Sequence, residues 1–512
     1  MDRFDVAVIG AGPEGLVAAI TLAREGLRVV LLDRANEPGG RAATLEFHPG
    51  FRASPYADEL PAIPSRLYRK LDLARHGAIL APSPASVCIS PAGESLLFAE
   101  EVRLSRTVPA AIFPGVIAFR EETEALQSAI ESRARLPPAP SQRRWFASTR
   151  PLARPAPWPA GGWGGASLEE AIVARVAEPQ FRLHLAADAV SGRAVSPFLA
   201  GTALHALAPG IGRSGQPVAG LGRLGAALVR AAVAAGVAIR CGTAVAGIHV
   251  TRGRATALAV AGRGQIETAA ILSALDLKQT LLHLIPWNTL PGAILKRIER
   301  FRLAGQRARV LFALDRPPDF PMARESPDAA CGPIHVVESL QALSLAHDVW
   351  RAGVIPHAPL VTLRVPSFSD PRLAPIGKAV MTATISAIPT HPFDGGWTDA
   401  KRAKLAAFAL GAAVRAMPGV EGLVLAQHII AGPDIENMLG ATDGDIEGGE
   451  LAPDQALGFR PFGGTQWQDG RTPIRGLYLG GPSSAAAPFL LGVSGERAAL
   501  ALAADFKAAR LR

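Results

Sequence analysis

Residues 5–33 read DVAVIGAGPEGLVAAITLAREGLRVVLLD, and this stretch decides the fold. Asp5–Ile9 is a short apolar run rich in Val and Ile, which predicts a buried β-strand. Leu16–Glu25 repeats apolar residues at a helical period. Arg28–Leu32 predicts a second strand, and Asp33 closes it. A strand, a glycine loop, a helix and a second strand ending in an acid are typical of a doubly wound parallel sheet.

The loop between the first strand and the helix carries three glycines, Gly10, Gly12 and Gly15, in the pattern G-x-G-x-x-G. Gly10 allows the tight turn, Gly12 lets the backbone approach a pyrophosphate, and Gly15 lets the helix pack against the strand. The amide groups at the helix start then face the phosphate charge. Asp33 follows Gly12 by about 20 residues, the separation at which a carboxylate accepts both ribose hydroxyls of an adenosine. The stretch therefore predicts a dinucleotide site.

The same glycine spacing occurs twice more, at residues 210–215 and 220–225. Neither copy follows a strand-like run, and neither precedes a second strand that ends in an acid at the right distance. We interpret both copies as loop glycines.

A second glycine turn follows Asp33 closely, because residues 37–44 read EPGGRAAT. This segment resembles the second glycine motif of the flavoprotein superfamily that includes amine oxidases and phytoene desaturases. The resemblance implies that Gly39, Gly40 and Arg41 lie against the pyrophosphate of FAD. Simple nicotinamide dehydrogenases do not carry this turn.

The resemblance extends along nearly the whole chain. The other matching segments are PGFR at 49–52, LDLARHG at 71–77, LAADAV at 185–190, PVAGLG at 217–222, GATDGDI at 440–446 and LAPDQ at 451–455. They are similar to the phytoene-desaturase-related family, in the branch of pyridine nucleotide-disulfide oxidoreductase-domain proteins. Their order and spacing together carry the resemblance, since no single segment is diagnostic.

The resemblance implies an α/β fold in which two domains are built from discontinuous segments. A Rossmann-type FAD-binding domain is expected from residues 1–80, 215–285 and 455–512, and an α+β substrate domain from residues 81–214 and 286–454. The residue patterns supply matching pieces, with helices predicted at 226–235 and 496–507 and strands at 237–240, 243–250, 266–273 and 476–481.

The resemblance also implies cofactor contacts beyond the first glycine loop. Val245 would pair its backbone with the adenine, although a core valine is the alternative, and Gly481 would lie near the ribityl-phosphate chain. The last helix begins near Gly492 and would direct its N-terminus at the flavin ring. The predicted cofactor-binding residues are Gly10, Gly12, Pro13, Glu14, Gly15, Asp33, Arg34, Gly39, Gly40, Arg41, Val245, Gly481, Gly492 and Val493.

One turn departs from the family pattern. Relatives have a glycine-rich turn with a His-Pro pair, whereas residues 483–489 of this chain read SSAAAPF. Ala485 stands at the histidine position and Phe489 replaces a glycine. A bulkier apolar segment beside the flavin would reshape the face that receives the substrate, so the family's catalytic details do not carry over.

The composition favours an apolar substrate. Charged residues make up 19% of the chain, and its only tyrosines are Tyr56, Tyr68 and Tyr478. Amine oxidases usually flank the flavin with an aromatic cage, and a paired-tyrosine cage is not expected here. A flavin accepts a hydride from a C–H bond held about 3–3.5 Å away. We therefore predict an FAD-dependent oxidoreductase that dehydrogenates or desaturates a lipophilic small molecule, with reoxidation by oxygen or a quinone.

Two other function classes stay open. The altered turn motivates a flavin-binding interaction or chaperone-like protein with little turnover, and the superfamily also contains amine and amino-acid oxidases. Candidates for catalysis are few. Tyr56 and His48 follow the Gly-Gly turn, and Asp276 and Lys278 follow a predicted strand of the second FAD segment. A packed, solvated or capping side chain is the alternative for each of them.

Composition excludes several other classes. The three cysteines are far apart, which excludes a disulfide framework, and the eleven histidines show no metal-binding spacing. No apolar run approaches the ~20 residues of a membrane span, and no secretory signal is visible, so a cytoplasmic location is expected.

The net charge of +9 comes mainly from residues 132–168, which hold six arginines among prolines and no Asp or Glu. This segment predicts a solvated loop, or else a lid or a peripheral membrane contact through Trp145, Phe146 and Trp158. Nucleic acid is not an expected partner.

Overall fold

The structure is a computed structural model. It describes residues 4–81, 84–91, 93–97, 102–104, 113–134, 163–207, 216–217, 220–262, 264–456, 459–462, 467, 469–484 and 489–508. Most of the basic proline-rich segment and residues 485–488 of the altered turn lie outside the described residues. The expectation of a membrane contact by that segment therefore stays a prediction.

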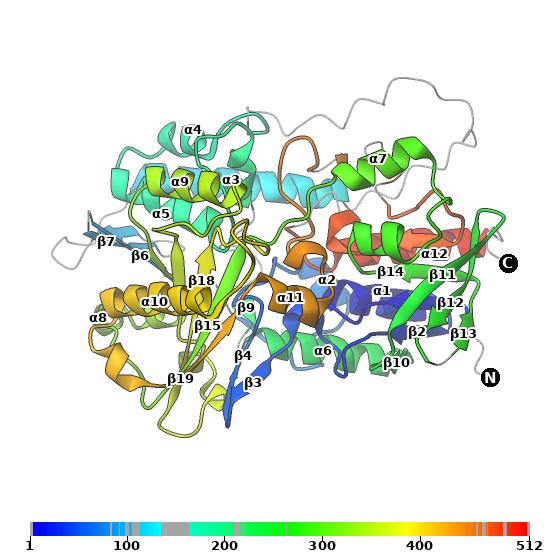
Figure 1. Ribbon diagram of the computed structural model, residues 1–512, viewed down its shortest axis with the longest axis horizontal. Coiled ribbons are helices and arrows are strands. Elements are labelled where there is room, and N and C mark those ends of the chain that lie inside the picture. Colours follow the sequence, from blue (N-terminus) through cyan, green and yellow to red (C-terminus); the bar gives the residue numbers. More distant parts are fainter. Residues whose placement is uncertain are drawn as a thin grey trace.

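Five parallel strands form the sheet that the amino-terminal stretch predicted (Figure 1). In spatial order they are β10 (Ala238–Arg240), β2 (Val29–Leu32), β1 (Val6–Ile9), β14 (Ala270–Ser273) and β20 (Leu477–Leu479). The strand order reverses between β1 and β14, and ligands of doubly wound sheets bind at such a point. The predicted α/β class and Rossmann-type sheet are confirmed.

The two faces of this sheet are covered differently. Val6, Val8 and Leu31 point toward helices α1 (Pro13–Arg24), α6 (Leu221–Ala234) and α12 (Val493–Lys507). The alternate residues, such as Ala7 and Ile9, pack against the antiparallel strands β11 (Val245–Thr251), β12 (Arg254–Val260) and β13 (Gly264–Glu267). Because both faces are buried, β1 and β2 read as unbroken apolar runs rather than as alternating ones.

Two local expectations were wrong. The strand predicted at 266–273 is two strands, since β13 joins the antiparallel sheet and β14 the parallel one. The predicted loop glycines Gly222 and Gly225 lie inside α6. A Cβ on Gly222 would come within 2.0 Å of Thr44 Oγ1, so its hydrogen side chain is what lets α6 pack against the segment after the Gly-Gly turn.

The second unit is built on a mixed eight-stranded sheet, at the left in Figure 1. Its strands in spatial order are β19 (Val424–Ile430), β15 (Arg307–Leu314), β18 (Ala379–Ser386), β17 (Val361–Arg364), β16 (Ile334–Val336), β6 (Ser86–Ser90), β7 (Gly93–Leu97) and β8 (Val102–Leu104). α10 (Asp399–Ala416) covers one face, and α5 (Pro179–Val190) packs on part of the other. The α+β character is confirmed, and the exact domain boundaries stay predictions.

The remaining elements are short. They are α2 (Ser65–Lys70), α4 (Leu168–Val173), α7 (Gly292–Arg300), α8 (Pro321–Glu325), α9 (Leu340–Arg351), α11 (Gly432–Leu439), β3 (Leu45–His48), β4 (Phe51–Ala53), β5 (Leu80–Ala81) and β9 (Gln216–Pro217), with the longer α3 (Pro114–Ala134). No described helix has the length and apolar character to cross a membrane. In the same part of the chain, no group of three His, Cys, Asp or Glu side chains is arranged to hold a metal ion.

Candidate functional site: a dinucleotide cradle and an adjoining pocket

The first glycine loop sits at the carboxyl ends of β1 and β14. Gly10 has φ +97°, and a Cβ there would lie 3.2 Å from Leu275 Cδ2, in the turn after β14. A Cβ on Gly15 would lie 1.8 Å from Gly10 O. These contacts explain why the sequence places glycine at both positions, since the helix start must touch the strand end.

The two glycine turns meet backbone to backbone. A Cβ on Gly40 would lie 2.7 Å from Gly12 Cα, and Gly39 donates its amide to Ala11 O at 2.9 Å. Among the described residues, the amides of Gly12, Gly40 and Arg41 have no acceptor. Converging free amides at a helix N-terminus bind anions.

Arg41 adds charge to this cradle. Its Nη1 donates to Ile446 O at 2.6 Å, whereas its Nη2 is buried without a hydrogen-bond partner and lies 3.7 Å from Glu14 Oε1. An unpartnered buried guanidinium nitrogen normally costs free energy, and a phosphate oxygen would satisfy it. The residues present therefore fit a pyrophosphate, as the second glycine motif predicted.

Asp33, the residue predicted to bind an adenosine ribose, lies beside the first glycine loop. Asp33, at the end of β2, accepts the amides of Ala11 at 2.6 Å and Ala35 at 2.8 Å. Each carboxylate oxygen keeps a lone pair for a ribose hydroxyl. Thr243 donates its amide to Asp33 O at 2.7 Å, which brings Val245, the first residue of β11, to this edge.

Glu14 ties the first helix to the last one. Its carboxylate accepts the amides of Gly492 at 2.9 Å and Gly495 at 3.2 Å, at the start of α12. Burial raises its pKa, while Arg41 and the two amides act in the opposite direction. The amides of Val493 and Ser494 have no acceptor among the described residues, so they are the groups that α12 leaves open. The sequence pattern did not indicate this role for Glu14.

Gly481 lies where β20 ends. A Cβ there would lie 2.3 Å from Leu275 O, so β20 and β14 end in direct backbone contact. Gly481 O accepts the hydroxyls of Ser484 at 2.7 Å and Ser494 at 2.5 Å, which joins this turn to the start of α12. The structure thus brings the predicted residues of both glycine turns, β20 and α12 to one edge of the sheet.

Other predicted residues make contacts elsewhere. Arg34 donates to the carbonyl groups of Glu436 and Asn437 in α11. Tyr56 is buried in an apolar cluster beside the eight-stranded sheet, and burial raises its pKa to about 12. His48 ends β3, with its ring 5.5 Å from that of Phe51.

Asp276 acts as a cap, which was the alternative considered for it. It accepts the amides of Lys278 and Gln279, both at 2.9 Å, and the amide and hydroxyl of Thr442, also at 2.9 Å. It therefore anchors the segment that follows α11.

A pocket adjoins the cradle, and sequence reasoning missed it. A small hollow that opens to solvent is lined by Pro61, Arg193, His205, Gln306, Glu447, Gly449, Glu450, Leu451 and Phe489. Neither Tyr56 nor His48 lines it. The segments 440–446 and 451–455, which resemble the family, lie on either side of Glu447 and Glu450 in the sequence. They could have indicated this site.

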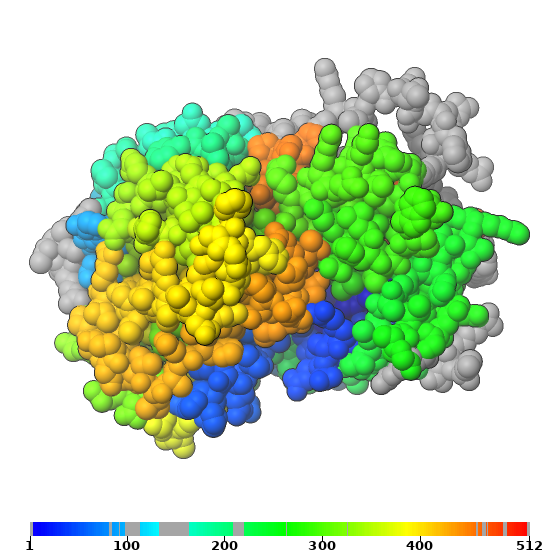
Figure 2. Space-filling view, in the orientation of Figure 1, coloured from blue at the N-terminus to red at the C-terminus, as the bar shows by residue number. Residues whose placement is uncertain are grey.

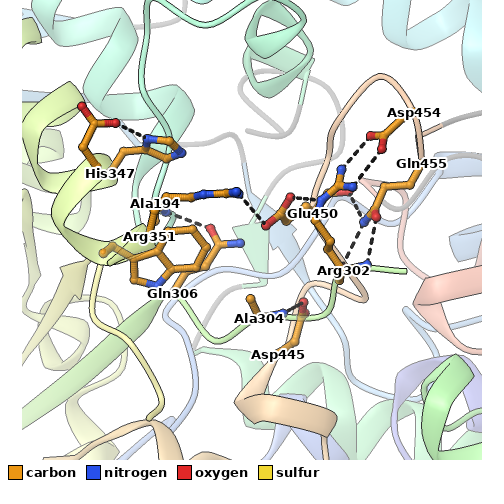
Figure 3. Close-up of polar contacts among 12 residues, drawn as sticks. Ala194, Arg302, Ala304, Gln306, His347, Arg351, Asp445, Glu450, Asp454 and Gln455 are labelled. Carbon is orange, nitrogen blue, oxygen red and sulfur yellow. Dashed lines mark hydrogen bonds and ion pairs between the residues drawn. The ribbon is translucent and has the colours of Figure 1, made fainter. Parts of the chain in front are cut away.

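Ion pairs surround this pocket. Glu447 pairs with Arg193 at 3.1 Å and with Arg307, and the two arginines hold its pKa well below the usual range despite burial. Figure 3 shows Glu450 between Arg351, at 4.0 Å, and Arg302, at 2.5 Å.

Neutral polar groups complete the lining. Gln306 Oε1 accepts the amide of Ala194 at 2.8 Å. Burial, and secondarily the charge of Arg193, lowers the pKa of His205 to about 3, so this imidazole is neutral at physiological pH.

Comparisons with known proteins agree with this geometry. A family model described as an NAD(P)-binding Rossmann-like domain matches residues 8–57. Pyridine nucleotide-disulfide oxidoreductase domain-containing protein 2 of Rattus norvegicus is 28% identical, over 99% of this chain and 94% of its own length. The resemblance predicted from the glycine turns and the segments beyond them is confirmed.

Solved structures share the fold. An oxidoreductase from Methanosarcina mazei superposes with a TM-score of 0.57 at 18% identity, covering 98% of this chain and 99% of that one. Cyclohexylamine oxidase from Brevibacterium oxydans IH-35A gives 0.58 at 14% identity and covers both chains fully, at 100% each. At such identities the likeness establishes the fold alone.

Proposed function

Starting from the relationship to pyridine nucleotide-disulfide oxidoreductase domain-containing proteins, we propose that this protein is an FAD-dependent oxidoreductase that removes hydride from a lipophilic small molecule. One observation carries the proposal. The backbones of Gly12 and Gly40 touch, and the buried Nη2 of Arg41 beside them lacks a hydrogen-bond partner. A pyrophosphate bridging the two glycine turns accounts for both features.

The chain's own residues then have defined tasks. The amides of Gly12 and Gly40 and the guanidinium of Arg41 bind the pyrophosphate, and Asp33 orients the adenosine ribose. The N-terminus of α12, held by Glu14, places its positive dipole end and two open amides where negative charge would be stabilised. Bound FAD would supply the hydride acceptor.

The substrate side is supported by the pocket beyond the cradle. Phe489 and Leu451 line it, and Phe489 and Val493 belong to one buried apolar cluster. These two side chains offer apolar surface to a bound molecule. We propose that reoxidation uses oxygen or a quinone.

An amine oxidase is the second candidate, because cyclohexylamine oxidase shares the whole architecture. The tyrosines of this chain argue against it. Tyr56 is packed in an apolar cluster, Tyr68 donates to Ala78 O at 2.5 Å, and Tyr478 donates to Asp505 at 2.7 Å. Because two of the three tyrosines are held by these hydrogen bonds, a paired-tyrosine cage is not supported, and dehydrogenation of a lipophilic molecule remains the first proposal.

The test begins with the purified protein incubated with FAD and desalted. We expect a flavin spectrum, anaerobic bleaching by a lipophilic substrate, and recovery when oxygen or a quinone is added. Arg41→Met should weaken FAD binding about tenfold or more, because a charge-assisted hydrogen bond is lost. Arg52→Met, at an exposed ion pair with Glu46, is the matched control.

Two results would count against the proposal. If the protein stays colourless and FAD does not raise its melting temperature, FAD is not its cofactor. Bleaching by amines alone, with peroxide release, moves the function to the second candidate.

A further inference from the structure

We propose that the pocket lined by Arg193, His205 and Gln306 binds the carboxylate head of the substrate, so that the substrate is a lipophilic carboxylic acid. This inference rests on the proposed function and names the substrate class of the same site. The pocket lies beside the cofactor edge, its carboxylates are already paired with arginines, and it holds hydrogen-bond donors.

The pocket and the cradle lie on two sides of one segment, residues 445–451. Within it, Ile446 O accepts from Arg41 Nη1 at 2.6 Å, and Glu447 lines the pocket. A Cβ on Gly448 would lie 2.7 Å from Pro482, in the turn after β20. In Figure 2 the orange atoms around α11, just before this segment, lie against the blue atoms of the N-terminal unit. A molecule in the pocket is therefore next to the cofactor edge.

The carboxylates that line the pocket are already paired with arginines. Among the described residues, the ion-paired cations around it are Arg193, Arg302, Arg307 and Arg351, and their carboxylate partners are Glu447, Glu450 and Asp454. Of these groups only Arg193, Glu447 and Glu450 line the pocket, so its lining carries one cation and two anions. Each glutamate lies between two arginines, and this pairing reduces its attraction for an ammonium group.

Hydrogen-bond donors are available in the pocket. Arg193 uses Nη1 on Ala189 O and Nη2 on Glu447, and a guanidinium has five N–H groups. The amide oxygen of Gln306 is occupied by Ala194, which leaves its NH₂ group. Both pocket carboxylates already accept from arginines. A ligand with acceptor oxygens would satisfy these donors.

His205 provides the unpartnered group. It is 7% exposed, it lines the pocket, and its buried Nδ1 has no hydrogen-bond partner. A neutral imidazole carries one N–H, which can donate to a carboxylate oxygen. The apolar part of the ligand would follow Phe489 toward Val493, at the N-terminus of α12, where the hydride acceptor is expected.

The test compares decanoate, decanol and decylamine, which share one apolar chain and differ in the head group. Binding to the FAD-loaded protein is measured by equilibrium dialysis. We expect decanoate to bind about tenfold or more tightly than either of the others, and Arg193→Gln to remove this preference. Arg193→Lys, which keeps the charge, should retain part of it. Arg324→Gln, at an exposed ion pair with Asp319, is the matched control.

Equal binding of the three probes, tighter binding of decylamine, or an unchanged preference in Arg193→Gln would overturn the inference. If Arg193→Gln does not fold, the Lys variant and the three-probe comparison on the wild type still decide. Dialysis does not depend on flavin chemistry, and the absorbance spectrum reports FAD separately. A failure of the carboxylate site is therefore distinguishable from a failure of the proposed function.

Discussion

Glu14 shows how one side chain joins the parts of the cofactor edge. It lies within the first glycine motif, yet its carboxylate accepts hydrogen bonds from the amides of Gly492 and Gly495 and pairs with Arg41. The cradle and the N-terminus of α12 consequently hold fixed positions relative to each other. The pattern of residues 10–15 predicted a phosphate loop, but its partner lies near residue 492, so local reading could not assign this task.

Buried histidines give the protein a definite pH response. His184 is fully buried between Ser86 and Ser95, hydrogen-bonded at 3.0 and 2.8 Å, and burial lowers its pKa to about 3. The folded state therefore binds fewer protons than the unfolded state between about pH 3 and 6.5. The stability from neutral His184 is complete above pH 6.5 and is lost as the pH falls.

We predict that His184→Gln flattens this response. Between pH 6.5 and 5, the free energy of unfolding of the variant should fall less steeply than that of the wild type, by up to about 1.4 kcal/mol per pH unit for one proton. Urea denaturation followed by tryptophan fluorescence measures it. His249→Gln, at an exposed position on β11, should keep the wild-type slope. Identical slopes in all three proteins would show that His184 does not titrate in this way.

At the scale of elements, sequence patterns predicted the strands and helices that form from neighbouring residues. β1, α1 and β2 appeared where the apolar runs placed them, because each is a short unit bounded by glycine or a charge. The run at 266–273 was misread because Ile266 and Glu267 end one strand, Ala270–Ser273 form another, and the two strands join different sheets. The two strands separate because each pairs with a different neighbour, and composition alone does not predict the pairing.

The contact between α6 and the second glycine turn yields a prediction. A Cβ on Gly222 would meet Thr44 Oγ1 at 2.0 Å and Thr44 Cβ at 2.9 Å. Gly222→Ala should therefore destabilise the protein by about 1–3 kcal/mol through overpacking, and should weaken FAD binding by displacing the turn. Gly411→Ala is the matched control, because nothing lies within 4 Å of a Cβ there and it is also inside a helix.

In Gly411→Ala, the higher helix propensity of alanine should raise the free energy of unfolding by up to about 1 kcal/mol. Thermal unfolding and FAD titration of the two variants measure both effects. Stabilisation by both substitutions would mean that α6 shifts freely and does not support the cradle.

At the scale of the whole molecule, the pocket illustrates what sequence reasoning could not reach. Arg193, His205, Gln306 and Glu447 come from separate stretches of the chain and meet only after both sheets are in place. Each alone is an unremarkable polar residue in the sequence. The cofactor edge was predictable because glycine spacings indicate close backbone contacts. A pocket formed by single side chains from distant segments leaves no such spacing in the sequence.

The two units are also tied by a buried ion pair. Arg309, on β15, is 0% exposed and donates to Asp58 at 2.8 Å and to Ser54 O at 3.0 Å, in the segment after β4. Thr382, on β18, donates to Asp58 at 2.9 Å. Arg309 is the main group that lowers the pKa of Asp58, so this carboxylate is charged in the interface. Removing only the arginine would leave a buried charge without its partner.

We therefore expect Arg309→Met to cost about 3–5 kcal/mol of unfolding free energy, and the double variant Asp58→Asn with Arg309→Met to recover part of that loss. The recovery separates the penalty of an unpaired charge from a simple loss of packing, which the double variant would not repair. Urea denaturation of the four proteins of this cycle measures the coupling. The single variant should also be cleaved faster by a protease at low concentration, since the second unit then separates more often from the parallel sheet. Additive losses in the cycle would mean that packing, and not the ion pair, holds the two units together.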